Sequence, residues 1–115
     1  AVAEVGRLLE RLVGVDQVDP ANILVVTGGT SMRDQIIDEN PGGFVCDRWE
    51  ERFEGNIVCE TIHRTKGLER DAVILVTSQA DLPDNLLYVG MSRAISKLII
   101  VGPPALRARL GLDEQ

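Results

Sequence analysis

The sequence predicts an α/β domain in which helices flank a parallel β-sheet. Apolar runs alternate with segments of helical periodicity, and the runs are apolar at nearly every position. Strands that are buried on both faces in this way are typical of parallel sheets. The four runs lie at residues 23–26, 57–62, 72–77 and 98–101. Aromatic residues make up only 3% of the chain, so Val, Ile and Leu form the predicted core, and these residues suit buried strands.

The first half of the chain carries two predicted helices. Apolar residues recur at helical spacing over residues 2–13, and Gly14 is placed to end this helix. A second helix is predicted over residues 32–39, with Thr30 or Ser31 as its N-cap.

The second half is legible except at its start. Residues 44–55 show no clear pattern, although Trp49 and Phe53 are four apart and are predicted to share a helical face in the core. Two later helices are predicted, at residues 83–93 and 105–110. Gly90 lies inside the first of these, and because glycine costs a helix about 1 kcal/mol relative to alanine, we expect it to pack closely against the sheet.

Length and charge describe a single small domain. The 115 residues are expected to form one domain, 1–115. Eighteen acidic and twelve basic residues give a net charge of -6, which argues against a free-standing nucleic-acid binder but permits a local basic site. No apolar run approaches the ~20 residues that a membrane span needs, so no membrane partner and a cytoplasmic location are expected. The chain begins at Ala1, so we expect a piece of a longer protein.

The two cysteines, Cys46 and Cys59, are not arranged for metal binding. Neither belongs to a CxxC pair, and a single histidine cannot complete a Cys/His zinc set. We therefore predict two reduced, semi-buried thiols and no metal site.

Ligands of a parallel sheet bind at the carboxyl ends of its strands. Three loops follow predicted strands and are expected to share that edge: residues 27–31, 61–69 and 78–82. The first contains Gly28 and Gly29 between a strand and a helix N-terminus, a geometry that can bind an anion. It is equally the pattern of an ordinary strand-to-helix turn, and both interpretations stay open.

The loop TIHRTKGLE at residues 61–69 carries most of the chemistry. Thr61 and His63 can donate hydrogen bonds to phosphate oxygens, while Arg64 and Lys66 add positive charge. Taken alone, the same residues also describe a polar loop with a solvated histidine.

The far end of this loop suits a nucleotide. Backbone N–H groups around Gly67 can approach a phosphate because no Cβ is in the way. Glu69 is a suitable partner for a ribose hydroxyl. One loop could thus contact a nucleic-acid backbone at one end and a nucleotide at the other.

A second motif, LYVGMSRA at residues 87–94, ends with Arg93. This arginine lies about a quarter-turn from the centre of the apolar helix face, so it should emerge at the rim. It is either a surface charge or an arginine finger directed at a γ-phosphate, a contact that contributes about 10³–10⁵ in rate.

Together, TIHRTKGLE and LYVGMSRA resemble motifs V and VI of UvrD/Rep-type superfamily 1 DNA helicases. The resemblance covers residues 22–102 in outline and is sharp over 57–94. It implies a RecA-like, three-layer α/β/α domain, the second of two such domains. ATP with Mg²⁺ would lie in the cleft between them, bound mainly by the N-terminal RecA-like domain.

The resemblance also implies roles for individual residues. Thr61 and His63 match positions that contact single-stranded DNA, and Arg64 and Lys66 are expected to add backbone contacts. The positions that match nucleotide contacts are Gly67, Glu69 (on the ribose) and Arg93 (on the γ-phosphate). Tyr88 matches a tyrosine of the motif VI helix, which we expect to be packed.

Departures from the family pattern limit these expectations. The first strand is followed by Thr27-Gly28-Gly29, where many relatives carry an Arg and an Asn that hold DNA. No GxxxxGK[ST] phosphate loop occurs in the chain, so the chain alone should not hydrolyse ATP.

Three functions remain open from sequence. The first is the C-terminal motor domain of an ATP-dependent DNA helicase or translocase, of the kind that serves DNA repair. The second is a helicase-like binding module without motor activity, although intact Glu69 and Arg93 speak against it. The third is an unrelated small nucleotide-binding α/β protein.

Overall fold

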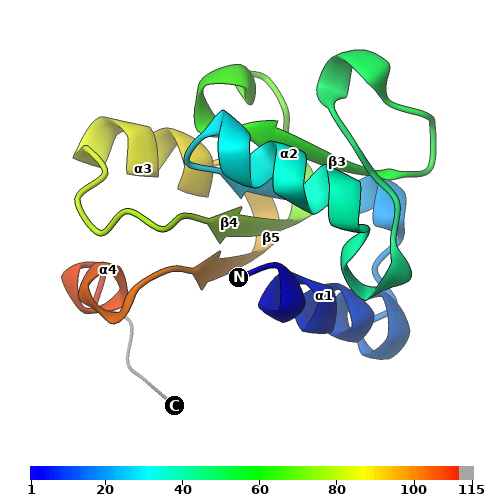
Figure 1. The fold of residues 1–115 in the computed structure, drawn as a ribbon, viewed down its shortest axis with the longest axis horizontal. Coiled ribbons are helices and arrows are strands. Elements are labelled where there is room, and N and C mark those ends of the chain that lie inside the picture. Colours follow the sequence, from blue (N-terminus) through cyan, green and yellow to red (C-terminus); the bar gives the residue numbers. More distant parts are fainter. Residues whose placement is uncertain (112–115) are drawn as a thin grey trace.

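A five-stranded parallel sheet forms the centre of the molecule, as the sequence predicts (Figure 1). The computed structural model describes residues 1–111. Every pair of neighbouring strands is parallel, and the order across the sheet is β2-β3-β1-β4-β5. The strands are β1 Ile23–Thr27, β2 Cys46–Asp47, β3 Ile57–Thr61, β4 Arg70–Val76 and β5 Ala94–Val101.

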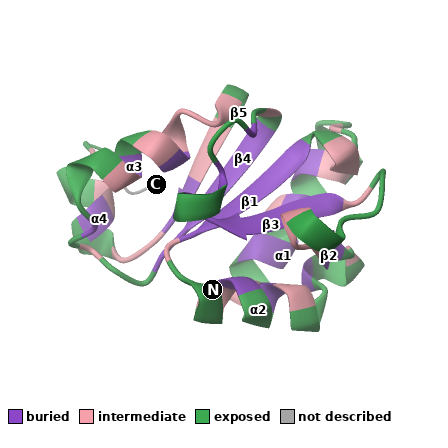
Figure 2. Ribbon diagram, turned by 90° about the horizontal axis from the view of Figure 1, so that it is seen from above, coloured by how far each residue is buried: buried purple, intermediate pink, exposed green. Residues whose placement is uncertain are grey.

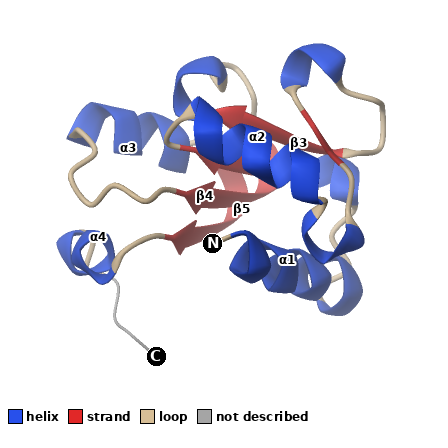
Figure 3. Ribbon diagram, in the orientation of Figure 1, coloured by secondary structure: helices blue, strands red, loops and turns tan. Residues whose placement is uncertain are grey.

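Helices cover both faces of this sheet and complete three layers (Figures 2 and 3). The helices α1 and α2 lie on one side of the sheet, and α3 and α4 lie on the other. Their bounds are α1 Val2–Glu10, α2 Thr30–Glu39, α3 Asp84–Met91 and α4 Pro104–Arg109. Short 3-10 turns lie at Pro20–Asn22, Pro41–Gly43, Trp49–Glu51 and Ile62–Arg64. The predicted three-layer α/β/α architecture is therefore confirmed.

The strand β1 shows why the apolar runs are continuous. All five of its residues are buried. Ile23 and Val25 pack in the core beneath α1 and α2, whereas Leu24 and Val26 pack in the core beneath α3 and α4. Because successive side chains point to opposite faces, a strand covered on both sides needs apolar residues at every position.

Two predicted helix ends are wrong. The first helix does not stop at Gly14 but continues through a π-helical turn, Arg11–Val15, and the chain turns at Gln17, which has a φ of 60°. The helix α2 begins at Thr30 with Gly29 as its N-cap, and no side chain caps it. Thr30 and Ser31 therefore lie in the first turn and not before it.

The segment that showed no clear pattern contains the unpredicted strand β2. This strand has only two residues and lies at one edge of the sheet. Trp49 is half-buried against the α3-side core, but Phe53 is 73% exposed, so the predicted shared core face is wrong. The guanidinium of Arg52 instead stacks 3.4 Å from the Trp49 ring centroid.

A candidate nucleotide and nucleic-acid site

The loop that connects β3 to β4 runs from the carboxyl end of the parallel strands back to their amino end. It leaves β3 at Thr61, which is opposite Thr27 at the carboxyl end of β1. It must return to the amino end, where Ala72 of β4 is opposite Ile23. We call residues 62–69 the crossover loop. The expectation that this loop lies entirely at the carboxyl edge is wrong, because only its start lies there.

Buried residues anchor the crossover loop on the α3 side of the sheet. Ile62 and Leu68 belong to the same core as Leu87 of α3. Thr65 is fully buried, and its hydroxyl donates to the Ile62 carbonyl at 2.8 Å. The Thr65 carbonyl in turn accepts the Leu68 N–H at 2.9 Å. Ile62, Thr65 and Leu68 thus fix the loop, and the side chains of His63, Arg64 and Lys66 face solvent.

Gly67 is an exposed residue of the crossover loop. Its φ is +80°, a conformation that L side chains rarely adopt, and no atom beyond its chain neighbours lies within 4 Å of the position that a Cβ would occupy. The backbone here is therefore accessible, as binding of a phosphate requires. Glu69 is also exposed, and none of the described residues forms a hydrogen bond or ion pair with its side chain.

Arg93 lies against the crossover loop. Its guanidinium donates to the carbonyls of Val89 at 3.0 Å and Thr65 at 3.3 Å, and to the Ser92 hydroxyl at 3.0 Å. Its own carbonyl accepts the N–H of Arg70 at 3.1 Å. Residues 65 and 70 flank Gly67 and Glu69, so the structure brings the three predicted nucleotide contacts to one corner of the molecule.

The helix α3 reaches this corner because Gly90 lets it approach the sheet. A Cβ at Gly90 would lie 3.3 Å from Cδ1 of Leu75 and 3.6 Å from Cγ1 of Ile62. The predicted close packing of Gly90 is therefore confirmed. Tyr88, by contrast, is 74% exposed, so the expectation that it is packed is wrong within the described chain.

The four predicted DNA contacts lie at the carboxyl end of β3 and just beyond it. Thr61 is buried, whereas His63, Arg64 and Lys66 are exposed. Arg64 donates to both carboxylate oxygens of Glu50, at 3.2 and 3.4 Å. Exposed ion pairs of this kind contribute little to stability, so Arg64 can exchange this partner for a phosphate at small cost.

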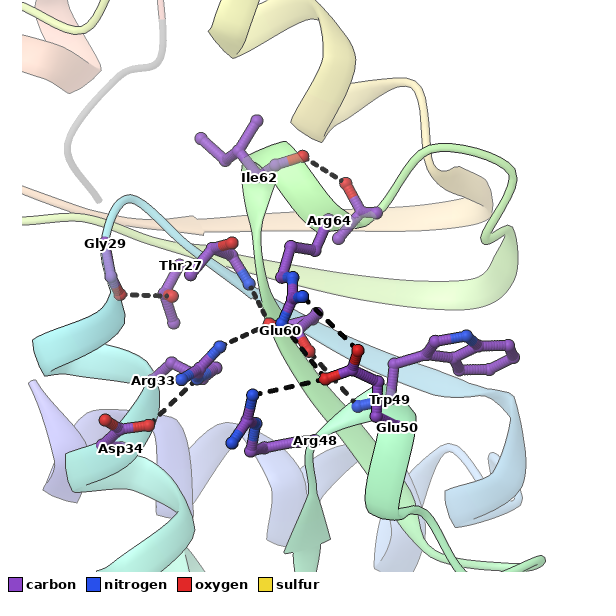
Figure 4. Close-up of polar contacts among 12 residues, drawn as sticks. Thr27, Gly29, Arg33, Asp34, Arg48, Trp49, Glu50, Glu60, Ile62 and Arg64 are labelled. Carbon is purple, nitrogen blue, oxygen red and sulfur yellow. Dashed lines mark hydrogen bonds and ion pairs between the residues drawn. The ribbon is translucent and has the colours of Figure 1, made fainter.

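A buried carboxylate that the sequence interpretation missed lies next to Thr61 (Figure 4). Glu60 accepts hydrogen bonds from Arg33 Nη1 at 2.8 Å, from the Thr61 N–H at 3.0 Å and from the Trp49 N–H at 3.3 Å. Burial raises the pKa of Glu60, but these hydrogen bonds outweigh burial and hold the pKa below its ordinary value. The signal in the sequence was a glutamate inside an otherwise apolar strand.

The loop after β1 forms a hollow at the carboxyl edge of the sheet. It has a volume of about 240 Å³, and its walls include Gly28, Ser31 and Gln79. A Cβ at Gly28 would lie 2.8 Å from the Thr77 hydroxyl, which gives this glycine a packing reason. The hydroxyl of Thr27 donates to the Gly29 carbonyl at 2.9 Å, which stabilises the turn without any ligand.

Two classes of feature are absent from residues 1–111. No group of three or more His, Cys, Asp or Glu side chains is placed to hold a metal ion. None of the helices there is both long and apolar enough to cross a bilayer.

The fold and the site together define a parallel three-layer α/β domain in which Arg93 packs against the crossover loop. Residues 56–101 match the family described as the UvrD-like helicase C-terminal domain. This segment contains both motifs, so the resemblance predicted from the sequence is confirmed.

The fold also has a solved counterpart. The C-terminal domain of a possible DNA helicase from Lactobacillus plantarum WCFS1 is similar to it with a TM-score of 0.68. The similarity covers 90% of this chain and 72% of the other at 21% sequence identity, so it concerns the fold. No curated protein matches the chain.

Proposed function

We propose that this chain is the C-terminal motor domain of an ATP-dependent DNA helicase or translocase. The observation that supports the proposal is the hydrogen bond from Arg93 to the Thr65 carbonyl, which holds the guanidinium against the loop that carries the exposed Gly67 and Glu69. The family match over residues 56–101 supports it. The chain would form one wall of a composite ATP pocket, and an N-terminal RecA-like domain of the same protein would form the other.

On this wall, each residue has a distinct task. Glu69 would accept hydrogen bonds from the ribose, and the backbone at Gly67 would approach the nucleotide. Arg93 would serve as the arginine finger. At present its guanidinium bonds only to neutral acceptors, so exchange of these for the oxygens of a γ-phosphate would replace neutral hydrogen bonds with stronger charge-assisted ones.

At the other end of the crossover loop, the same chain would grip single-stranded DNA. Thr61 and His63 would donate to backbone phosphates, and Arg64 and Lys66 would add charge. The loop spans the sheet from this end to Arg93, and it is anchored in between by Thr65. Closure of the cleft would therefore act on both ends of one connected segment.

The phosphate-loop lysine and the hydroxyl that binds Mg²⁺ would come from the N-terminal domain, because no such motif occurs in this chain. The isolated chain would consequently not hydrolyse ATP. The alternative function, a helicase-like binding module, leaves the juxtaposition of Glu69 and Arg93 without a use.

The test is ATP hydrolysis by a protein in which this domain is joined to its phosphate-loop domain, with single-stranded DNA present. We expect Arg93→Ala to lower kcat about 10³-fold, with a much smaller change in the KM for ATP. Arg7→Ala is the matched control, because Arg7 is an exposed arginine on α1, the helix on the opposite side of the sheet. A kcat within tenfold of the unmodified protein, or no hydrolysis by the joined protein, would contradict the proposal.

A further inference from the structure

The carboxylate of Glu60 accepts hydrogen bonds from three segments of the fold. Its Oε1 accepts from Arg33 of α2 and from the backbone of Thr61, and its Oε2 accepts from the backbone of Trp49 (Figure 4). The donors come from sequence positions 27 and 11 residues away and from the next residue. No other carboxylate in residues 1–111 is fully buried.

Stability is a poor explanation for this arrangement. Glu60 is 0% exposed and Arg33 is 6% exposed, so both charges are taken out of water. Replacing a buried ion pair with apolar residues of similar volume is often neutral or stabilising. A buried charge pair does fix the orientation of the groups around it, because its hydrogen bonds hold the donors in place.

The donors lie where the proposed DNA contacts begin. Thr61 is itself one of those contacts. Trp49 is followed by Glu50, which pairs with Arg64. Arg33 extends from the start of α2, and its backbone N–H donates to Gly29 at 3.3 Å. A single carboxylate thus connects α2, the turn at Trp49 and the end of β3.

We propose that Glu60, held by Arg33, is a positioning residue that sets Thr61 for contact with single-stranded DNA. This inference rests on the proposed function, because it assigns Glu60 to the DNA end of that site. Glu60 itself does not touch the nucleic acid. It orients the peptide between residues 60 and 61, and with it the Thr61 side chain.

Loss of the Glu60 carboxylate should weaken the binding of single-stranded DNA. The glutamine replaces the charged acceptor of the Thr61 N–H with a neutral amide oxygen, which holds the Thr61 peptide less firmly. We expect Glu60→Gln to weaken binding of an oligothymidylate roughly 3- to 10-fold, as loss of one well-placed hydrogen bond does. Simple electrostatics predicts the opposite sign, because removal of a negative charge from the protein strengthens its attraction to DNA.

The experiment uses the 115-residue chain labelled with ¹⁵N and titrated with a 15-nucleotide oligothymidylate at low salt. Glu54→Gln is the matched control, because it makes the same charge change at an exposed residue whose side chain forms no hydrogen bond or ion pair within residues 1–111. We expect its affinity to stay within twofold of the unmodified chain. Equal effects of Glu60→Gln and Glu54→Gln would overturn the proposal.

Two further readouts separate positioning from loss of folding. In the unmodified chain, the oligothymidylate should shift the amide resonances of Thr61 and Trp49 together, because they share one carboxylate. The double variant Arg33→Met with Glu60→Met removes the charges without leaving one unpaired, so it keeps the fold. It should bind DNA as weakly as Glu60→Gln, and normal binding by this variant would overturn the proposal.

A double-mutant cycle distinguishes this inference from the proposed function. If Glu60 acts through Thr61, Glu60→Gln causes no further loss of affinity in a Thr61→Ala background. Additive losses would show that Glu60 acts elsewhere and would overturn the inference alone. Normal DNA binding by Thr61→Ala would overturn the DNA role of Thr61, and with it both proposals for this end of the site.

Discussion

Replacement of Glu60 by glutamine tests the buried ion pair as a structural feature. The change keeps the shape of the side chain and leaves Arg33 buried without its main counter-ion. Removal of one partner of a buried pair costs about 3–5 kcal/mol. Arg33 also donates to the exposed Asp34 at 3.0 Å, and this contact survives. We therefore expect the low end of the range, about 3 kcal/mol.

This loss is large for a domain whose total stability is about 5–15 kcal/mol. With a urea m-value of about 2 kcal/mol/M, the unfolding midpoint should fall by about 1.5 M. The assay is urea unfolding followed by fluorescence of Trp49, the only tryptophan in the chain, whose N–H donates to Glu60. The probe therefore lies at the site of the change.

Two further variants serve as controls for the urea midpoint of Glu60→Gln. Glu54→Gln should leave the midpoint within the scatter of surface substitutions, about 0.5 kcal/mol. The double variant Arg33→Met with Glu60→Met should recover most of the loss, because no unpaired charge remains buried. A midpoint for Glu60→Gln equal to that of Glu54→Gln would refute the reasoning, since it would mean that the buried pair is not formed in solution.

Three other outcomes are expected. Because the pKa of Glu60 is lowered in the folded chain, its contribution to stability is complete above its ordinary pKa and is lost as the pH falls through the folded value. The difference in urea midpoint between the unmodified chain and Glu60→Gln should therefore shrink in acid, and a constant difference would contradict this. Gly6→Ala should lower the free energy of unfolding by about 1–3 kcal/mol, because its Cβ would lie 2.7 Å from the backbone N of Gly42; an unchanged thermal midpoint would show that α1 does not pack there. Burial raises the pKa of Cys46 to about 12 and that of Cys59 well above its ordinary value, so neither thiol should react with a thiol reagent at pH 8 until urea unfolds the chain; rapid reaction of the native chain would contradict this burial.

The sheet could be predicted from the sequence because its long strands are apolar on both faces. The runs within β1, β3, β4 and β5 gave the parallel α/β class directly. The strand β2 could not be found in this way, because two residues at a sheet edge carry no apolar periodicity. Phe53 was misplaced for a related reason. Its spacing from Trp49 suggested a helix, but the chain makes only a short 3-10 turn there and leaves Phe53 exposed.

The two motifs could be found in the sequence, but the contacts between them could not. The order of the two motifs places Arg93 near the crossover loop, and the structure has that proximity. The roles of Thr65 and Glu60 depend on hydrogen bonds to residues that are distant in sequence. No pattern in one sequence encodes such pairings. The exposure of Tyr88 was not predicted, because the apolar spacing of α3 indicates which face packs on the sheet but not whether other parts of the domain cover Tyr88.

We propose that Gly67, Glu69 and Arg93 form one wall of an ATP pocket shared with a second domain. The most direct measurement is the structure of the two joined domains with a transition-state analogue of ATP hydrolysis bound between them. We expect the Arg93 guanidinium to leave the carbonyls of Val89 and Thr65 and to lie about 3 Å from oxygens at the γ-phosphate position. An occupied pocket in which Arg93 keeps its contacts with those two carbonyls would contradict it.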